Sequence, residues 1–214
     1  MKVGILGTGM VGATVGSKLI QLGHEVKMGS RSASNENAVQ WAKENGGQAS
    51  TGTFADAAMF GEIVFNCTAG VASLAAINSA GANNLKGKIL VDVANPLDFS
   101  KGMPPTLTVC NTDSLGEQIQ KAFPSVRVVK ALNTMNCKVM AEPTLVGGEH
   151  DAFVCGNDPS AKAKVREVLT SFGWKSMIDL GDISAARGME MLLPIWLRLM
   201  GQFQTANFNF KIAR

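Results

Sequence analysis

The stretch KVGILGTGMVG, residues 2–12, decides the fold of this chain. Residues 2–6 form a short apolar run typical of a buried strand, and a helical pattern follows over residues 10–22. Between them, Gly7, Gly9 and Gly12 have the spacing G-x-G-x-x-G. Where this spacing joins a strand to a helix, it is typical of a site that holds the pyrophosphate of a dinucleotide.

Each of these glycines has a predicted task. Gly7 makes the tight turn, Gly9 lets the backbone approach a pyrophosphate, and Gly12 lets the helix lie close to the strand. The unpaired N–H groups and the positive dipole end of the helix then face the phosphates. We therefore predict a cradle of six residues: Gly7, Thr8, Gly9, Met10, Val11 and Gly12. The alternative is a glycine-rich turn without a ligand.

Short apolar runs alternate with helical patterns along the rest of the chain. Strands are expected at 2–6, 25–28, 62–66, 88–93 and 126–130, with a weaker one at 48–51, and helices at 10–22, 35–45, 71–80 and 113–122. This alternation predicts an α/β fold: a Rossmann-type doubly wound, mainly parallel sheet with a small C-terminal α/β extension.

We assign residues 1–130 to the dinucleotide-binding core and 131–214 to an extension that packs on it and completes the acceptor pocket. In the extension we expect strands at 152–155 and 175–179 and helices at 159–172 and about 184–200. Asp158 and Pro159 are suited to start the first of these helices, and Gly173 to end it. The alternating tail, residues 207–214, is a candidate short strand.

Composition excludes several classes of function. The chain has 214 residues, 46% of them hydrophobic, and a net charge of +3 from scattered lysines and arginines, so we expect no nucleic-acid partner. It shows neither a signal peptide nor an apolar run of membrane-spanning length, so a cytoplasmic location without a membrane partner is expected. Four dispersed cysteines, Cys67, Cys110, Cys137 and Cys155, predict buried thiols and no metal site.

The segment KMGSRS, residues 27–32, distinguishes the two dinucleotides. NAD-selective sites usually place an acid after the second strand to bind the ribose, and none stands here. The hydroxyl of Ser30 and the guanidinium of Arg31 can instead bind a 2′-phosphate, with Ser32 or Ser34 as a further donor. The predicted cofactor is therefore NADP(H), and the alternative is a solvated arginine at a strand end.

Three further corners follow strands at the edge where ligands of open α/β sheets bind. They are NCTAG (66–70), ANPLD (94–98) and KALNT (130–134). From them we predict that Thr68, Ala69, Asn95, Pro96, Asn133 and Thr134 line the ribose and the nicotinamide. Each corner taken alone is also compatible with a plain turn.

No catalytic side chain is predicted. Both histidines, His24 and His150, fall in loops and are expected at the surface, and hydride transfer between two rings requires no protein acid or base. This favours a redox ring or a metal chelate as the partner. An alcohol or imino-acid reductase would need a lysine, tyrosine or acid in the pocket; the chain has no tyrosine, and Lys130 and Lys138 are only distant candidates.

The motifs GTGMVG, MGSRS, NCTAG, DVANP, VKALNT and VCGNDPSAK resemble, in order and spacing, those of the F420-dependent NADP reductase family. The dinucleotide domain of that family is related to the STEAP metalloreductases. The resemblance implies a homodimer that passes a hydride between NADPH and the deazaflavin F420. Family members often carry a lysine shortly after GSR, where this chain has Asn35.

The C-terminal segment bears on the acceptor. Arg187 resembles the family's contact to the deazaflavin, whereas Met191 and Leu193 stand where F420 reductases tend to have hydroxyls. The pocket is therefore expected to suit a flatter acceptor such as a flavin, a quinone or a ferric chelate. Trp196 is a candidate anchor of the dimer interface. The alternative function is an NADP(H)-binding module that senses redox state or supports a partner with little turnover.

Overall fold

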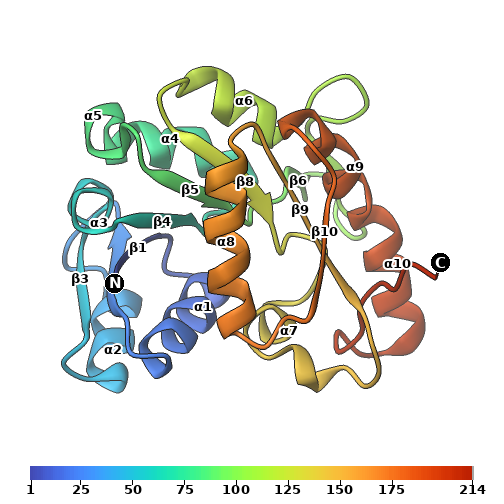
Figure 1. Ribbon diagram of the computed structural model, residues 1–214, viewed down its shortest axis with the longest axis horizontal. Helices are drawn as coiled ribbons and strands as arrows, with labels where there is room; N and C mark the ends of the chain where they lie inside the picture. Colours follow the sequence, from blue (N-terminus) through green and yellow to red (C-terminus); the bar gives the residue numbers. More distant parts are fainter. Residues whose placement is uncertain (214) are drawn as a thin grey trace.

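In the computed structural model, which describes residues 1–213, the central feature is an eight-stranded sheet in the order β10-β9-β8-β5-β4-β1-β2-β3 (Figure 1). The parallel strands are β1 (Lys2–Leu6), β2 (Glu25–Ser30), β3 (Ala49–Thr53), β4 (Ile63–Asn66), β5 (Ile89–Asp92) and β8 (Arg127–Ala131). The strand order reverses between β1 and β4, and ligands of open α/β sheets bind at the carboxyl ends of the strands beside such a reversal. The predicted Rossmann-type sheet is confirmed.

The C-terminal extension continues the same sheet. Strand β9 (Asp151–Gly156) pairs antiparallel with β8, and β10 (Ser176–Asp179) pairs parallel with β9. Because β9 runs antiparallel to β8, it starts at the edge of the sheet where β8 ends. The connecting helix α7 (Cys137–Ala141) and the short helix η1 (Pro143–Leu145) lie between these strands in the chain.

Helices cover both faces of the sheet, so most strands are apolar on both sides. One face carries α1 (Met10–Gln21), α2 (Glu36–Asn45), α7 and α8 (Pro159–Ser171); the other carries α3 (Phe54–Phe60), α4 (Gly70–Ala80), α5 (Ala82–Leu85), α6 (Leu115–Ala122) and α9 (Ala186–Met191). Successive strand residues alternate between the two cores: Phe65 packs in the first and Val64 in the second. Figure 1 shows α8 lying across the strands.

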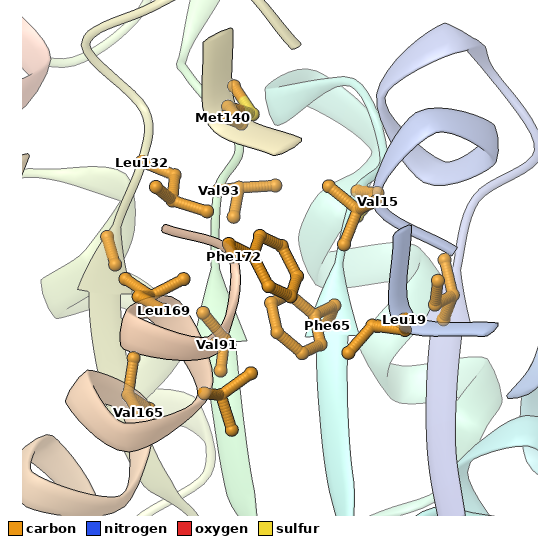
Figure 2. Close-up of a cluster of buried hydrophobic side chains, with 14 of the residues drawn as sticks. Val15, Leu19, Phe65, Val91, Val93, Leu132, Met140, Val165, Leu169 and Phe172 are labelled. Carbon is orange, nitrogen blue, oxygen red and sulfur yellow. The ribbon is translucent and has the colours of Figure 1, made fainter. Parts of the chain in front are cut away.

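Figure 2 shows the first core, where Phe65 of β4 and Phe172 lie side by side at the centre. Val15 of α1 approaches them from one side and Leu169 of α8 from the other, and all four side chains are at most 2% exposed. The core therefore joins the N-terminal half of the chain directly to the extension. The start of α8 is as predicted, with the Asp158 side chain accepting a hydrogen bond from the N–H of Ala161.

The C-terminal segment differs from the single helix expected over residues 184–200. It divides into η2 (Ile183–Ala185), α9 and α10 (Leu193–Phe203), and Pro194 stands in the first turn of α10, where its missing N–H costs no hydrogen bond. Within residues 1–213, no helix combines the length and apolar character needed to cross a membrane.

The expected strand over residues 207–214 is not found among the described residues 207–213, and Arg214 lies outside them. The N–H of Asp151 donates to the carbonyl of Phe210, but the N–H of Ile212 donates to the carboxylate of Asp151 instead of continuing a ladder. Sequence patterns also did not indicate α3, α5, α7 or the hairpin of β6 (Leu97–Asp98) and β7 (Thr106–Leu107).

Candidate functional site

The glycine turn has the geometry that its predicted tasks require. Gly7 has φ +115°, and a Cβ atom on it would lie 2.7 Å from the carbonyl oxygen of Cys67. A Cβ atom on Gly12 would lie 2.3 Å from the carbonyl oxygen of Gly7, so the helix can start here only without a side chain. A Cβ atom on Gly9 would have no atom of residues 1–213 within 4 Å. The space over Gly9 is therefore open to a ligand.

Two helices that begin at this edge have no side-chain cap within the described chain. They are α1, whose N-cap is Gly9, and α4, whose N-cap is Ala69, whereas α2, α3, α6 and α8 are capped by Asn, Thr, Ser and Asp. Uncapped N–H groups at a helix start are suited to bind an anion. The start of α4 also lies against the next corner, because a Cβ atom on Gly70 would be 2.0 Å from the carbonyl oxygen of Asn95.

The Ser30 loop adjoins the glycine turn. The N–H of Gly7 donates to the carbonyl of Gly29 at 3.0 Å, and Ser30 is the last residue of β2. The N–H of Ser32 donates to the Ser30 Oγ at 3.2 Å, while Arg31 is exposed and forms no ion pair with any residue of 1–213. The Ser30 hydroxyl donates to the carbonyl of Ser32. The loop thus offers the hydroxyls of Ser32 and Ser34 and the Arg31 cation, with no acid over residues 29–35.

Ser34 and Asn35 have local roles. The Ser34 Oγ lies 2.9 Å from the Ser32 Oγ, which keeps the hydroxyls of this loop together. The Asn35 side chain accepts from the N–H of Ala38 at 3.1 Å and so caps α2. Asn35 is therefore used to start a helix.

A buried polar network lies beneath the strand ends and connects the predicted corners. Thr68 donates to the Asn66 Oδ1 at 2.7 Å, and the Asn66 Nδ2 donates to the Asp92 Oδ1 at 2.8 Å. The Asp92 Oδ2 in turn lies 2.8 Å from the Nζ of Lys130. The corners that follow β4, β5 and β8 therefore share one set of hydrogen bonds.

Lys130 is fully buried and has three acceptors: Asp92, the carbonyl of Ala94, and the Glu190 Oε1 at 2.8 Å. Burial acts to lower the pKa of Lys130, but the carboxylates of Asp92 and Glu190 outweigh it and raise that pKa above its ordinary value. The charged form of the side chain is thus favoured, and its three N–H groups are occupied.

These contacts argue against a lysine as the proton donor of the site. Lys130 is occupied, and Lys138 is exposed on the surface of α7. Sequence analysis missed Glu190 altogether. The sequence did contain a signal for it, since Glu190 is an acid within the apolar run GMEML, residues 188–192. An acid in an apolar run is expected to be buried, and a buried acid needs a partner for its charge.

The two asparagines of the other corners bond to each other. The Asn95 Nδ2 donates to the main-chain carbonyl of Asn133 at 2.7 Å, and the Asn133 Nδ2 donates to the Asn95 Oδ1 at 2.9 Å. The Asn133 Nδ2 also donates to the carbonyl of Met189 in α9 at 3.1 Å. Within residues 1–213, the Asn133 Oδ1 and the Thr134 Oγ1 are buried without a hydrogen-bond partner.

Arg187 and Met191, the two residues predicted to contact the hydride acceptor, lie on α9 and take no part in the hydrogen bonds of Asn95 and Asn133. Arg187 forms a bidentate ion pair with Glu117 of α6, in which the Nε of Arg187 lies 2.8 Å from the Oε2 of Glu117. The hydrogen bonds from Arg187 lower the pKa of Glu117 below its ordinary value. Arg187 also lines a groove of about 840 Å³ with Leu74 and Ile183. Met191, at the end of α9, is exposed. Their roles toward an acceptor stay predictions.

Both histidines lie in loops, as expected, and are half-buried at the surface. The His150 Nδ1 lies 2.9 Å from the Asn209 Nδ2, its Nε2 lies 3.0 Å from the carbonyl of Pro143, and the Nδ1 of His24 lies 3.4 Å from the amino terminus. Both loops pack against neighbouring segments, and this places polar groups beside the imidazole nitrogens of the two histidines.

Three cysteines are buried as expected, whereas Cys110 is exposed, because it lies in the loop before α6 and not at a strand end. Burial raises the pKa of Cys67 and raises that of Cys155 to about 12. No group of His, Cys, Asp and Glu within residues 1–213 is arranged to hold a metal ion.

Comparison with known proteins agrees with this geometry. A protein from Arthrobacter sp. FB24, provisionally described as an F420-dependent NADP-reductase, has a solved structure with a TM-score of 0.97 and 55% identity, and the match covers all of both chains. The family model for NADP oxidoreductase, coenzyme F420-dependent, matches residues 2–96. This chain belongs to the F420-dependent NADP reductase family.

Two curated relatives are more distant. The metalloreductase STEAP3 of Rattus norvegicus is 30% identical over 202 residues, which are 91% of this chain and 38% of that protein. The F420-dependent NADP reductase of Methanocaldococcus jannaschii is 29% identical over 129 residues, which are 60% of this chain and 57% of that protein. The chain thus spans less than two thirds of the length of either curated relative.

Within this F420-dependent NADP reductase family member, the glycine turn, the Ser30 loop, the corner that follows β4, and Asn95 and Pro96 of the corner that follows β5 lie inside the range of the family model. Asn133, Thr134, Arg187 and Met191 lie outside that range but inside the full-length match to the Arthrobacter protein. The resemblance identified from the sequence is therefore confirmed across both parts of the chain.

Proposed function

We propose that this protein is an NADP(H)-dependent oxidoreductase that transfers a hydride between NADPH and a ring acceptor. One observation carries the proposal: the acid-free loop of Ser30 and Arg31 lies beside the uncapped start of α1, joined to it by the bond from Gly7 to Gly29. This arrangement offers one positively polarised surface for a pyrophosphate and a separate cation for a 2′-phosphate.

The residues fit the cofactor along its length. The N–H groups at the start of α1 would hold the pyrophosphate, with space over Gly9, and Ser30, Arg31 and Ser32 would hold the 2′-phosphate. Thr68, Ala69, Asn95, Pro96, Asn133 and Thr134 would surround the ribose and the nicotinamide. The unpartnered Oδ1 of Asn133 and Oγ1 of Thr134 provide polar groups for a ring substituent at that end.

NADPH supplies the hydride when bound, so the protein has to bind, orient and exclude water. The chain agrees with this role, because the buried ammonium of Lys130 has its three N–H groups occupied and holds the strand ends in place. The names of two relatives favour F420 as the acceptor. The exposed Met191 near Arg187 favours an apolar ring such as a flavin or quinone, or a ferric chelate.

Calorimetry with NADPH and NADH tests the cofactor. We expect Arg31→Ala to weaken NADPH about tenfold or more and to leave NADH unchanged, because a charged hydrogen bond to the 2′-phosphate contributes on the order of 1.5 to 3 kcal/mol. Lys86→Ala is the matched control, since Lys86 is an exposed cation at the opposite, amino end of β5. Equal weakening of both nucleotides by Arg31→Ala would contradict the assignment.

A panel of acceptors tests the reaction. The purified protein is mixed with NADPH and F420, FMN, FAD, a quinone or a ferric chelate, and the nicotinamide absorbance is followed. Oxidation of NADPH with at least one of them is the expected result. Tight NADPH binding without turnover across the panel would favour the redox-sensing or accessory module.

A further inference from the structure

A cavity lies in the C-terminal extension, at the edge of the sheet where β9 and β10 begin. Its volume is about 650 Å³, and three segments line it: the loop from η1 to β9, the turn between α8 and β10, and Lys211 of the C-terminal tail. The described residues that line it include none of those predicted to bind the dinucleotide or the acceptor. In the strand order, β10 and β9 stand at one end of the sheet and β2, which carries Ser30, near the other (Figure 1). The cavity is therefore separate from the glycine turn and the Ser30 loop.

Two aromatic side chains of the lining are held in place by hydrogen bonds. The Trp174 Nε1 donates to the carbonyl of Met140 at 3.0 Å, and the ring of His150 lies edge-on to that of Trp174, with 5.2 Å between the centroids. A carbonyl oxygen can only accept, so the His150 Nε2, 3.0 Å from the carbonyl of Pro143, carries the ring proton. The His150 Nδ1 accepts from the Asn209 Nδ2 at 2.9 Å. The cavity is thus pre-formed on this side, as ligand sites usually are.

The charged side chains of the lining favour an anion. Lys175 is exposed and forms no ion pair with any residue of 1–213. Lys211 pairs with Glu149 at 2.9 Å from Nζ to Oε2, but the two side chains are 45% and 88% exposed. A pair that faces water in this way contributes little, so Lys211 can turn toward a ligand at small cost. The lining therefore presents two ammonium groups against one carboxylate.

The loop from η1 to β9 adds main-chain donors. Gly147, Gly148 and Glu149 are consecutive residues of the lining, and their N–H groups have no hydrogen-bond partner within residues 1–213. A Cβ atom on either glycine would have no atom of the described chain within 4 Å, so the backbone here is open to a ligand. Free N–H groups beside a cation are suited to bind the oxygens of a carboxylate or a phosphate.

We propose that this cavity is a second ligand site, which binds a small organic anion: a carboxylate or phosphate attached to a flat apolar body. Lys175 and the free N–H groups of the loop would bind the oxygens, and Pro143, Val146 and Trp174 would contact the apolar body. The volume lies in the range of small-molecule sites, which combine an apolar lining with a few polar groups. The proposal goes beyond the oxidoreductase function and does not depend on it.

A ligand in this cavity would join segments that are far apart in the sequence. Lys211 stands in the tail between Phe210, whose carbonyl accepts from the N–H of Asp151, and Ile212, whose N–H donates to the Asp151 carboxylate. A ligand held by Lys175 and Lys211 would therefore fasten the tail to the turn before β10. Because such a ligand binds the folded chain alone, the free energy of unfolding should rise with its concentration.

Four probes test the charge and the apolar body separately. Calorimetry is carried out on the full chain with an excess of NADPH, so that the dinucleotide site is filled. Benzoate is compared with benzamide, its neutral analogue, and phenyl phosphate with inorganic phosphate, which has no apolar body. Benzoate and phenyl phosphate should each bind about tenfold or more tightly than the compound with which they are compared. The tighter of these two anions identifies the group that the cavity prefers.

Two variants of the lining should act in opposite directions on the tighter anion. Lys175→Met should weaken it about five- to tenfold by removing the unpaired cation, whereas Glu149→Gln should strengthen it about two- to fivefold by removing the carboxylate. Lys164→Met is the matched control, because Lys164 is an exposed lysine of α8 outside the lining. Circular dichroism melts verify that the variants fold, which is expected because all three positions are exposed.

Several results would overturn the proposal. They are equal affinity of the wild type for benzoate and benzamide, equal weakening by Lys175→Met and Lys164→Met, and absence of any binding below about 10 mM. Displacement of the probes by NADPH would place them in the dinucleotide site, which overturns the proposal and leaves the proposed function intact. Failure of NADPH itself to bind would contradict the proposed function alone, since the probes and the Lys175→Met variant can be compared without it.

Discussion

Glu190 of α9 and Lys130 of β8 form an ion pair with 2.8 Å between Oε1 and Nζ, and neither side chain is more than 1% exposed. Lys130 also holds Asp92 of β5, so one ammonium faces two carboxylates. The N–H groups at the start of α6 donate to Glu190 and help to compensate the second negative charge. The C-terminal segment is thus joined to the strand ends electrostatically.

Removing the ammonium should be strongly destabilising. Lys130→Met leaves Asp92 and Glu190 buried without their cation, and breaking a buried pair in this way costs about 3 to 5 kcal/mol. The free energy of unfolding from urea titrations measures the loss. Lys162→Met is the control, because Lys162 pairs with the partly exposed Asp179 and should cost about 1 kcal/mol or less. Similar losses for both variants would refute the buried network.

Two alanine substitutions in the glycine turn should have opposite effects on stability. Gly9→Ala places a methyl group in open space and should leave the unfolding free energy unchanged or raise it by about 0.4 to 1 kcal/mol. Gly12→Ala places it 2.3 Å from the Gly7 carbonyl oxygen and should destabilise the fold, since the backbone of α1 must move.

The same pair separates folding from binding. Gly9→Ala should weaken NADPH about tenfold or more in calorimetry although the protein melts normally, because the methyl group occupies the space for the pyrophosphate. A Gly9→Ala protein that binds NADPH as the wild type does would show that the space over this residue is not used.

The ion pair of Glu117 and Arg187 should stabilise the protein only above the acid range. Its hydrogen bonds lower the pKa of Glu117 in the folded protein below the ordinary 4.5, so its stabilisation is complete above that value and is lost as the pH falls through the lower folded pKa. Because Arg187 is 38% exposed, solvent screens the ion pair and the effect is small. Urea titrations of the wild type and Glu117→Gln should differ at pH 7 and converge in acid. A constant difference would assign the effect to packing.

Thiol labelling should distinguish one cysteine from the rest. At mildly alkaline pH the folded protein should react rapidly at Cys110 alone, because it is exposed, whereas burial raises the pKa of Cys67 and Cys155 and keeps them protonated. All four cysteines should react in urea. Cys110→Ser should abolish the rapid phase, and rapid loss of a second thiol would contradict the described burial.

The parallel part of the fold could be predicted because each strand is a short apolar run followed by a helical pattern. The elements that these patterns missed are short: α3 has seven residues, and the strands of the hairpin of β6 and β7 have two each. A local signal for α3 was present, since Thr53 and Asp56 form a capping box. The tail looked like a strand because it alternates, but alternation does not supply a partner edge.

For the candidate site, sequence gave the positions of the corners but not their connections. Asn95 and Asn133 follow strands that end at one edge, which the βαβ pattern predicts. The bond from Asn133 to Met189 spans 56 residues, and the pair of Lys130 and Glu190 likewise joins distant segments. Such contacts depend on how α9 returns to the sheet, which no local pattern encodes. The direction of the amides could therefore not be predicted.

The position of Glu190 also limits how such proteins can be recombined. Joining residues 1–130 to a foreign extension, in order to exchange the acceptor, would leave the ammonium at the junction with Asp92 as its sole counter-charge. A working chimera therefore needs an acid at the equivalent place in the donor sequence. Exchange of the extension and stability of the core are therefore linked in this architecture.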